Sequence, residues 1–402
     1  MNSRKAELTF KPNLRLGRHG WLRLTPAYSV NLVSHFLDQL PEVRQVLEPF
    51  CGTGTTPLVC AQRGIVCHAL EINPFLVWLA RAKTANYSAA ERETTRNIAH
   101  DAARCAESMS QTSLWTPPMA KIERWWRKDR LLFLARLRQS ILDRCQTESK
   151  VHDLLMVAFC RLLIECSNAA FNHQSMSFKQ EQAGLFDSQE SGALARRYEQ
   201  ITDEIVAAAE EDLPDCVRIW RADARQAPAG NELYDAVLTS PPYPNRMSYI
   251  REVRPYMYWM GFLSQAREAS DLDWQAIGGT WGAATSRLQT WTPNGDAVQV
   301  DGFSDMLQGI ARHSALLANY VHKYFVDISQ HLASVRDALT PGASVFYVVG
   351  NSKFYDTLAP VETFYAAILK RLGFVNVDIT PLRKRNSKKE LIEFVVSARK
   401  PL

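Results

Sequence analysis

The sequence predicts an α/β fold in which a mostly parallel sheet is interrupted by a helical insertion. Apolar runs of strand length alternate with helical runs in both halves of the chain, which is typical of parallel strands joined by helices. The alternation stops over residues 88–212, where long amphipathic runs such as LLFLARLRQSILDRC indicate helices. Glycine or proline directly follows two of the strand-like runs, where such a fold places its ligands.

The N-terminal half contains the first strand–turn–helix units. In chain order, the pattern predicts a helix near residues 28–37, a strand at 43–50, a turn at 52–54, a helix at 57–63, a strand at 65–73 and a helix through 75–80. The C-terminal half resumes with strands at 216–223 and 234–239, a polar loop region with Gly and Trp at about 264–303, a mostly helical stretch at 304–339, and strands at 343–352, 374–382 and 392–400.

Three parts of the chain follow from this pattern. Residues 1–87 hold an N-terminal segment and the first half of the α/β domain, and residues 213–402 hold its second half. Residues 88–212 form an insertion of about 125 residues, which is large enough for a helical subdomain.

The composition excludes several classes of protein. With 402 residues, 46% hydrophobic and 22% charged, the chain can bury a sizeable core, which excludes dominant disorder. A net charge of +5 permits a nucleic-acid partner without requiring one. No run of about 18 apolar residues and no signal-peptide pattern occurs, so we expect no membrane association and a cytoplasmic location. The eight cysteines form no CxxC pair, so we expect free buried thiols and no metal site.

The first candidate site is EPFCGTGTT, residues 48–56, where a predicted strand turns into a helix. Two glycines permit a positive φ and the close approach of a ligand. The pattern is not GxGxxG and lacks the lysine of a phosphate loop. Glu48 would repel a pyrophosphate and suits a ligand with a positive charge, such as the ammonium of a methionine moiety. A plain strand–helix turn is the alternative.

Acidic residues end the next two strands. Glu71 lies about 20 residues beyond the glycine turn, where an acidic side chain can accept hydrogen bonds from ribose hydroxyls. Asn73 and Pro74 also have the pattern of a helix N-cap followed by its first residue. Asp223 ends the third strand and is a candidate for an adenine amino group, although a solvated strand end explains it nearly as well.

The third candidate site is Ser240-Pro241-Pro242-Tyr243, which ends the strand YDAVL. Two successive prolines cannot donate to a strand ladder, so they fix the backbone and leave carbonyl groups for a ligand. The hydroxyl of Ser240 supplies a hydrogen-bonding group, and the ring of Tyr243 supplies a flat stacking face. Standing alone, the motif could equally be a proline-rich turn.

Together, EPFCGTGTT and TSPPY resemble the amino-methylating DNA methyltransferases. The resemblance implies a Rossmann-like class I methyltransferase fold, with a mostly parallel seven-stranded sheet and an antiparallel terminal strand. It implies methyl transfer from S-adenosyl-L-methionine to an exocyclic amine of a base flipped out of double-stranded DNA. The first motif resembles the family's cofactor loop, with Glu48 where Asp is usual. Ser240 resembles the cytosine-N4 branch more than the adenine-N6 branch. A cognate restriction endonuclease would be a further partner, and this chain does not identify one.

The resemblance and the motifs give the candidate site residues. The catalytic candidates are Ser240, Pro241, Pro242 and Tyr243, with Ser240 and the Pro241 carbonyl as acceptors for the amine hydrogens. The segment HGWLRLTPAYS stands where the family often has an additional cofactor contact, which adds Thr25 and Pro26. The cofactor-binding candidates are Glu48, Pro49, Phe50, Gly52, Thr53, Gly54, Thr55, Thr56, Glu71, Ile72, Asn73, Asp223, Thr25 and Pro26.

Clusters of cations and aromatic rings are the candidates for DNA contact, because DNA binding needs phosphate neutralisation. A solvated protein face explains any single cluster equally well. The DNA-binding candidates are Arg124, Trp125, Trp126, Arg127, Lys128, Asn245, Arg246, Arg251, Lys384 and Arg385. The insertion and the 264–303 region are both candidates for target recognition. Three alternatives to a cytosine-N4 enzyme remain: an adenine-N6 enzyme, an RNA base methyltransferase, and a cofactor-sensing protein without catalysis, against which the intact tetrapeptide argues.

Overall fold

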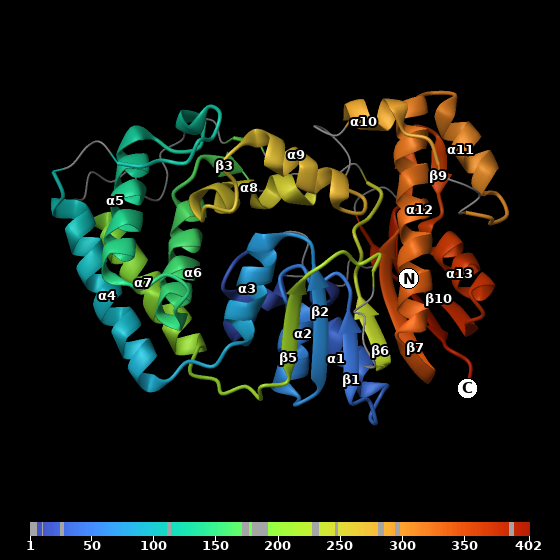
Figure 1. Cartoon of the computed structure of the whole chain (residues 1–402), viewed down its shortest axis with the longest axis horizontal. Coiled ribbons are helices and arrows are strands. Elements are labelled where there is room, and N and C mark those ends of the chain that lie inside the picture. Colours follow the sequence, from blue (N-terminus) through green and yellow to red (C-terminus); the bar gives the residue numbers. More distant parts are fainter. Residues whose placement is uncertain are drawn as a thin grey trace.

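The computed structural model describes residues 6–9, 11–24, 28–110, 114–170, 177–178, 192–226, 233–245, 248–279, 285–293, 298–385 and 390–402. A seven-stranded sheet forms the centre of the protein (Figure 1). From edge to edge its strands are β10 (Val375–Lys384), β11 (Ile392–Arg399), β7 (Leu339–Gly350), β6 (Tyr234–Thr239), β1 (Gln45–Glu48), β2 (Val66–Glu71) and β5 (Val217–Arg221).

The pairing of the strands confirms the predicted fold class. β1 runs parallel to β2 and β6, β2 runs parallel to β5, and β6 runs parallel to β7. β11, the last strand in the sequence, runs antiparallel to both of its neighbours, β7 and β10. The sheet order reverses at β1, which lies between β2 and β6, and this reversal opens a ligand crevice at the carboxyl ends of the strands. The fold is therefore Rossmann-like with the class I methyltransferase topology.

Helices cover both faces of the sheet. On β1, Val46 packs on the face of α1 (Val30–Asp38) and α2 (Thr55–Gln62), whereas Leu47 packs on the face of α12 (Ala315–Asp337). Because both faces of β1 are buried, its apolar residues Val46 and Leu47 follow each other directly instead of alternating with polar ones. The remaining helices of the two layers and the nearby short elements are α3 (Pro74–Thr84), α11 (Phe303–Ala311), α13 (Val361–Arg371), and a small ladder of β8 (Ser352–Phe354) and β9 (Thr357–Ala359).

The described part of residues 88–212 is mostly helical. It contains α4 (Ala89–Ser108), η4 (Ile122–Arg124), α5 (Lys128–Arg144), α6 (Lys150–Glu165) and α7 (Ala193–Ala208), with a two-residue ladder of β3 (Ala169–Ala170) and β4 (Ser177–Phe178). Ser88 and Glu91 form a capping box that stabilises the N-terminus of α4, the first helix of the insertion. In Figure 1 these helices stand to one side of the sheet, beyond α3.

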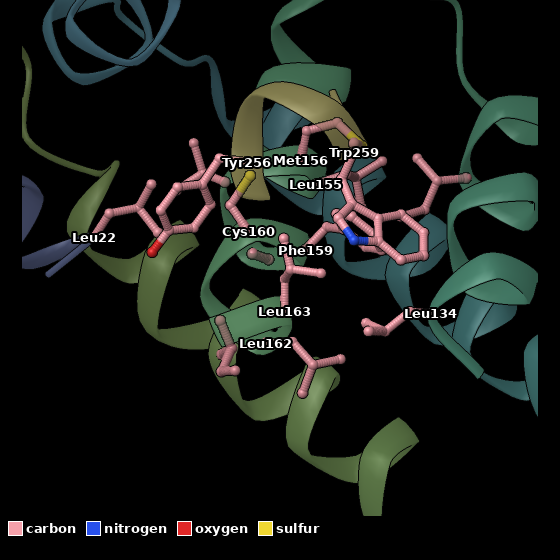
Figure 2. Packing of buried hydrophobic residues seen from close by; sticks show 14 of the residues in the cluster. Leu22, Leu134, Leu155, Met156, Phe159, Cys160, Leu162, Leu163, Tyr256 and Trp259 are labelled. Atoms are coloured by element: carbon pink, nitrogen blue, oxygen red, sulfur yellow. The ribbon is translucent and has the colours of Figure 1, made fainter. Parts of the chain in front are cut away.

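The insertion shares its hydrophobic core with a helix of the C-terminal half of the chain. Phe159 on α6 and Trp126 lie 5.6 and 5.8 Å, centroid to centroid, from the ring of Trp259 on α8 (Tyr249–Trp259). Figure 2 shows Trp259 and Tyr256 of α8 among Leu155, Met156 and Phe159 of α6. One continuous cluster therefore joins α3, the insertion and α8, so the insertion is packed rigidly on the helices beside the sheet.

The region at 264–303 differs from the loop that the sequence predicts. Residues Ala266–Gln275 form α9 and Thr285–Thr290 form α10. A capping box between Gln265 and Glu268 starts α9, and its buried Ala269 and Leu272 belong to the core that α8 shares. The polar composition of this stretch hid the two apolar positions that anchor the helix.

Arg18 fixes the N-terminal segment to two helix ends. This segment consists of η1 (Ala6–Leu8), η2 (Pro12–Arg15) and η3 (Gly17–Gly20), and the Arg18 side chain is fully buried. Its guanidinium donates to five backbone carbonyls at the C-terminal ends of α3 and α7, those of Lys83, Ala85, Ala208, Ala209 and Glu211. Carbonyls at a helix C-terminus have no partner within the helix, so one cation satisfies both ends at once.

No helix in the described part of the chain combines the length and the apolar character that crossing a bilayer requires.

We expect Arg18→Met to lower the free energy of unfolding by about 3 kcal/mol or more, because it leaves buried carbonyls unpaired. Urea denaturation followed by circular dichroism measures this change. Arg15→Met is the matched control, since Arg15 is exposed on the neighbouring η2, and its effect should stay within about 0.5 kcal/mol. Equal effects of the two substitutions would contradict the role of Arg18.

Candidate functional site

A cavity of about 440 Å³ lies at the carboxyl edge of the sheet, where the strand order reverses. It joins the three motifs that the sequence singles out. Of the predicted site residues, its walls include Pro49, Phe50, Gly52, Thr53, Thr55, Glu71, Ile72, Asn73, Asp223, Ser240, Pro241, Pro242 and Tyr243. The cavity has the size of pockets that hold drug-sized ligands and cofactors. Thr25 and Pro26 lie outside the described residues.

The two glycines of the turn have different tasks. Gly52 has a φ of +51°, and a Cβ there would meet nothing closer than the Phe50 carbonyl oxygen at 3.9 Å, so its open side faces the cavity. Gly54 has a φ of +80°, and a Cβ there would lie 3.0 Å from the Cβ of Ala80 on α3. Gly54 is therefore required by helix packing. Gly54 does not line the cavity, and its contact with a cofactor stays a prediction.

A buried lysine holds the turn from behind. The ammonium of Lys83 on α3 donates to the Thr53 carbonyl at 3.1 Å and to the His19 carbonyl at 3.4 Å. Burial lowers the pKa of Lys83 to about 8, because the charged form loses its hydration. Lys83 thus ties the cofactor turn to the N-terminal segment.

Glu71 braces the cavity side of the same turn. Its carboxylate accepts from the Gly52 amide at 2.8 Å and from the Asn73 amide at 2.9 Å. Burial raises the pKa of Glu71, and these two amides partly offset that rise. Asn73 caps α3 by accepting from the Phe75 amide at 3.0 Å, with Pro74 as the first helical residue. Both roles predicted for this strand end are therefore compatible.

Asp223 is neither free nor simply solvated. Its carboxylate accepts two-fold from Arg225, which also lies 2.9 Å from Asp327 on α12. Asp327 in turn pairs with the buried Lys323 at 2.6 Å. This chain of charges fixes the Asp223 carboxylate on the cavity wall and lowers its pKa.

Glu48 lies behind the cavity wall, where it is fully buried, and its contact with a ligand stays a prediction. One oxygen accepts from the Phe50 amide at 3.0 Å and from the Thr239 hydroxyl. The other accepts from the Thr56 hydroxyl at 2.6 Å and from the Tyr28 hydroxyl at 3.2 Å. Thr56 is likewise buried and serves this network rather than the cavity. Burial raises the pKa of Glu48 to about 7.

Three groups of the tetrapeptide, one side-chain hydroxyl and two backbone groups, form hydrogen bonds with different parts of the chain. The Ser240 hydroxyl donates to the Val348 carbonyl on β7 at 3.3 Å. The Pro242 carbonyl accepts from the Tyr324 hydroxyl at 3.0 Å, and the Tyr243 amide donates to the Tyr249 hydroxyl at 3.0 Å. That Ser240 and the Pro241 carbonyl accept the hydrogens of an amine stays a prediction.

The ring of Tyr243 is held between two elements of the C-terminal half. The guanidinium carbon of Arg385 lies 4.9 Å from the ring centroid, and a Cβ at Gly350 would come within 2.9 Å of the ring. Burial raises the pKa of the Tyr243 hydroxyl. A cation therefore lies close to the ring.

The residues predicted to contact DNA differ in how far they are exposed and in where they lie. Trp126 is fully buried and its indole N–H donates to the Leu163 carbonyl at 2.9 Å, so the prediction that it contacts DNA is wrong. Its neighbour Trp125 stacks on it at 5.8 Å. Exposed cations on the insertion and α8 are Arg124, Arg127, Lys128 and Arg251. Asn245 and Arg385 line the cavity, Lys384 lies half-buried at the end of β10, and Arg246 lies outside the described residues.

Several cavity residues were not predicted from the sequence. Leu8, Thr9 and Lys11 of the N-terminal segment form part of the wall. Asn13 holds this segment in place, because its side chain donates to the Tyr28 carbonyl at 2.9 Å and accepts from the Val30 amide at 3.1 Å. Other unpredicted wall residues are Tyr28, Tyr249, Arg383 and Glu393. Arg383 and Glu393 lie on β10 and β11, which pair as a hairpin. In the sequence, only the basic turn between these two strands drew attention to this region.

The thiol of Cys51, inside the glycine turn, is not activated. Burial raises its pKa well above the usual range, so the thiol stays protonated. Among the described residues, no three His, Cys, Asp or Glu side chains gather into a metal-binding group.

Comparison with known proteins gives two kinds of similarity. No family model matches the chain. Two proteins named type II methyltransferase M.AvaI, from Nostoc sp. and from Anabaena variabilis, are each 20% identical over 436 aligned residues, covering 96% of this chain and 85% of theirs. The solved rRNA methyltransferase aviRa from Streptomyces viridochromogenes covers 99% of this chain and is itself covered over 94%, with 13% identity and a TM-score of 0.29. The sequence similarity supports a methyltransferase.

We expect the stability difference between the wild type and Glu48→Gln to depend on pH. The pKa of Glu48 is raised in the folded chain, to about 7 from 4.5, so the folded chain binds this proton more tightly than the unfolded chain. The stabilisation from this proton is complete below about pH 4.5 and is lost as the pH rises through 7. The glutamine variant has no such proton.

Urea denaturation from pH 5 to 7 measures both proteins. The free energy of unfolding of the wild type, minus that of Glu48→Gln, should fall by up to about 1.4 kcal/mol per pH unit. A difference that stays constant across this range would show that Glu48 is ionised in the folded chain throughout.

Proposed function

We propose that this chain transfers a methyl group from S-adenosylmethionine to the exocyclic N4 of a cytosine that is flipped out of double-stranded DNA. The observation that carries the proposal is the single cavity that contains both the Gly52 turn and the Ser240–Tyr243 tetrapeptide. A methyltransferase must hold the cofactor and the acceptor amine side by side, and one cavity with both motifs meets this requirement. The similarity to two type II methyltransferases supports a DNA substrate.

The residues at the Gly52 end of the cavity fit the cofactor. The turn lets the methionine part approach the backbone at Gly52, while Glu71 has carboxylate lone pairs available for the ribose hydroxyls. Apolar side chains, among them Phe50, Ile72 and Ile277, offer flat contact for the adenine, and Asp223 is held beside them by Arg225. When bound, the cofactor supplies an electrophilic methyl group on a sulfonium.

The residues at the tetrapeptide end fit an aromatic amine. The lone pair of cytosine N4 is delocalised into the ring, so the amine is a weak nucleophile. The proton of the Ser240 hydroxyl is directed to Val348, so its lone pairs can accept one amine hydrogen. The Pro241 carbonyl can accept the other. Both bonds favour a pyramidal nitrogen whose lone pair points at the methyl group, and positioning supplies most of the rate.

The surroundings of the cavity fit a DNA duplex outside it. A base within a duplex cannot reach the tetrapeptide, so the target base must be flipped out. Arg251, at the start of α8, is an exposed cation beside the cavity-lining Ile250 and Val253. Exposed cations at Arg124, Arg127 and Lys128 start the insertion helix α5. We assign phosphate contacts to these residues and target recognition to the insertion together with α9.

The decisive experiment is nucleoside analysis of the methylated product. Purified protein is incubated with methyl-labelled S-adenosylmethionine and either mixed-sequence plasmid DNA or total RNA. N4-methylcytosine in the DNA is the expected product. N6-methyladenine would replace cytosine with adenine as the substrate, and label only in RNA would move the activity to RNA. Cofactor binding without transfer to either polymer would contradict catalysis.

We expect Glu71→Ala to weaken S-adenosylmethionine binding about 10- to 150-fold, because a hydrogen bond to a charged group contributes about 1.5–3 kcal/mol. Isothermal calorimetry measures this affinity. Glu71→Gln keeps one acceptor oxygen and should lie between the alanine variant and the wild type. Glu42→Ala, an exposed carboxylate ahead of β1, is the control. Unchanged affinity in Glu71→Ala would remove Glu71 from the cofactor site.

We expect Ser240→Ala and Tyr243→Ala to lower the single-turnover rate of methyl transfer while cofactor affinity stays near that of the wild type. Ser240 is proposed to accept a hydrogen bond from the amine, and the base is proposed to stack on the Tyr243 ring. Such stacking contributes about 1–3 kcal/mol. Tyr243→Phe should retain far more activity than Tyr243→Ala, because it keeps the ring. Rapid-quench assays measure the rate. A wild-type rate in Tyr243→Ala would make the tetrapeptide structural.

A further inference from the structure

Two arginines of the C-terminal hairpin, Arg383 and Arg385, line the tetrapeptide end of the cavity. Arg383 is occupied by Glu393, because its Nε and Nη2 lie 2.7 and 2.9 Å from the two carboxylate oxygens. Arg385 differs, since its guanidinium makes one hydrogen bond within the described part of the chain, from Nη1 to the Asn351 carbonyl at 2.7 Å. Its other N–H groups are donors available to a ligand.

The position of Arg385 is set by rigid partners. The Asn351 side chain donates to the Glu390 carbonyl at 2.8 Å and accepts from the Ile392 amide at 2.9 Å, which fixes the backbone that Arg385 bonds. The guanidinium lies over the Tyr243 ring. A Cβ at Gly350 would lie 2.9 Å from both Tyr243 and Arg385, so only glycine leaves room for this pair. The structure thus holds a fixed donor beside the base-stacking residue.

The donors and acceptors at this end of the cavity lie on different residues. Ser240, with its proton directed to Val348, presents acceptor lone pairs, and Arg385 presents only donors, because a guanidinium has no acceptor. A ligand that fits both must carry an amine beside ring acceptors. An aminopyrimidine with a carbonyl group meets this description.

We propose that Arg385 donates to the O2 and N3 acceptors of the target cytosine and thereby selects cytosine over adenine; this inference rests on the proposed function. Along its pairing edge cytosine presents an amine, the N3 acceptor and the O2 acceptor. Adenine presents an amine, the N1 acceptor and a C–H group. The two bases therefore differ at the third position, where adenine would leave an N–H of Arg385 facing a C–H.

The planar fork of the guanidinium matters for this selection. Two parallel N–H groups can meet two neighbouring acceptors of one base, whereas a lysine ammonium is a point charge without that geometry.

The test compares two duplexes that differ at one base. After the position methylated by the wild type has been mapped, one duplex carries cytosine there and the other carries adenine. Single-turnover rates with labelled S-adenosylmethionine are measured for wild type, Arg385→Ala and Arg385→Lys. The matched control is Lys353→Gln, a nearby cation on β8 that pairs with Glu390 and does not line the cavity.

Arg385→Ala should lower the cytosine rate at least about tenfold relative to the adenine rate, with cofactor affinity within about twofold of the wild type. Arg385→Lys should lose most of the same preference, and it carries the test if the alanine variant does not fold. Lys353→Gln should keep the wild-type ratio. An equal fall in both rates would show that Arg385 only supports Tyr243, and would overturn the proposal.

The outcomes that would contradict the proposed function differ from those that would contradict the role of Arg385. A wild-type protein that methylates neither DNA nor RNA contradicts methyl transfer itself. A wild-type protein that methylates the adenine duplex faster than the cytosine duplex leaves methyl transfer intact and overturns the assignment of Arg385.

Discussion

The site depends on one buried carboxylate. Glu48 accepts from Phe50 and Thr56 around the cofactor turn and from Thr239, the residue directly before the tetrapeptide. A carboxylate out of water is costly unless its lone pairs are used, so the four donors that surround it must all stay in place. This requirement sets the distance between the end of β1 and the end of β6. The Gly52 turn and the tetrapeptide are thereby held in one fixed relation.

Around this centre, helix ends and buried cations fix the remaining walls. Arg18 joins the ends of α3 and α7 to the N-terminal segment, and Lys83 joins the same segment to the turn. The walls of the cavity therefore come from parts of the chain that are far apart in sequence, and at Arg18 and Lys83 the anchoring cation bonds backbone carbonyls. Backbone carbonyls take the place of carboxylate partners, which is how a cation can be buried at helix C-termini.

The insertion packs against the C-terminal half of the chain and restrains its movement. Its helices share one core with α3 and α8, the helix that follows the tetrapeptide and supplies Tyr249. A movement of the insertion would therefore be transmitted to the base end of the cavity. Under the proposed function, this packing gives a direct physical route by which DNA contact on the insertion reaches the acceptor site.

The sequence alone determined the sheet, its interruption and the two chemical motifs, because strand and helix periodicity and glycine or proline turns are local signals. It also located most cavity residues of the turn, and the N-cap at Asn73. Only the tertiary structure decided that Glu48 and Trp126 are buried, that Gly54 packs on α3, and that Arg385 belongs to the cavity. Those outcomes depend on which side chains meet across distant segments, and local pattern does not encode such contacts.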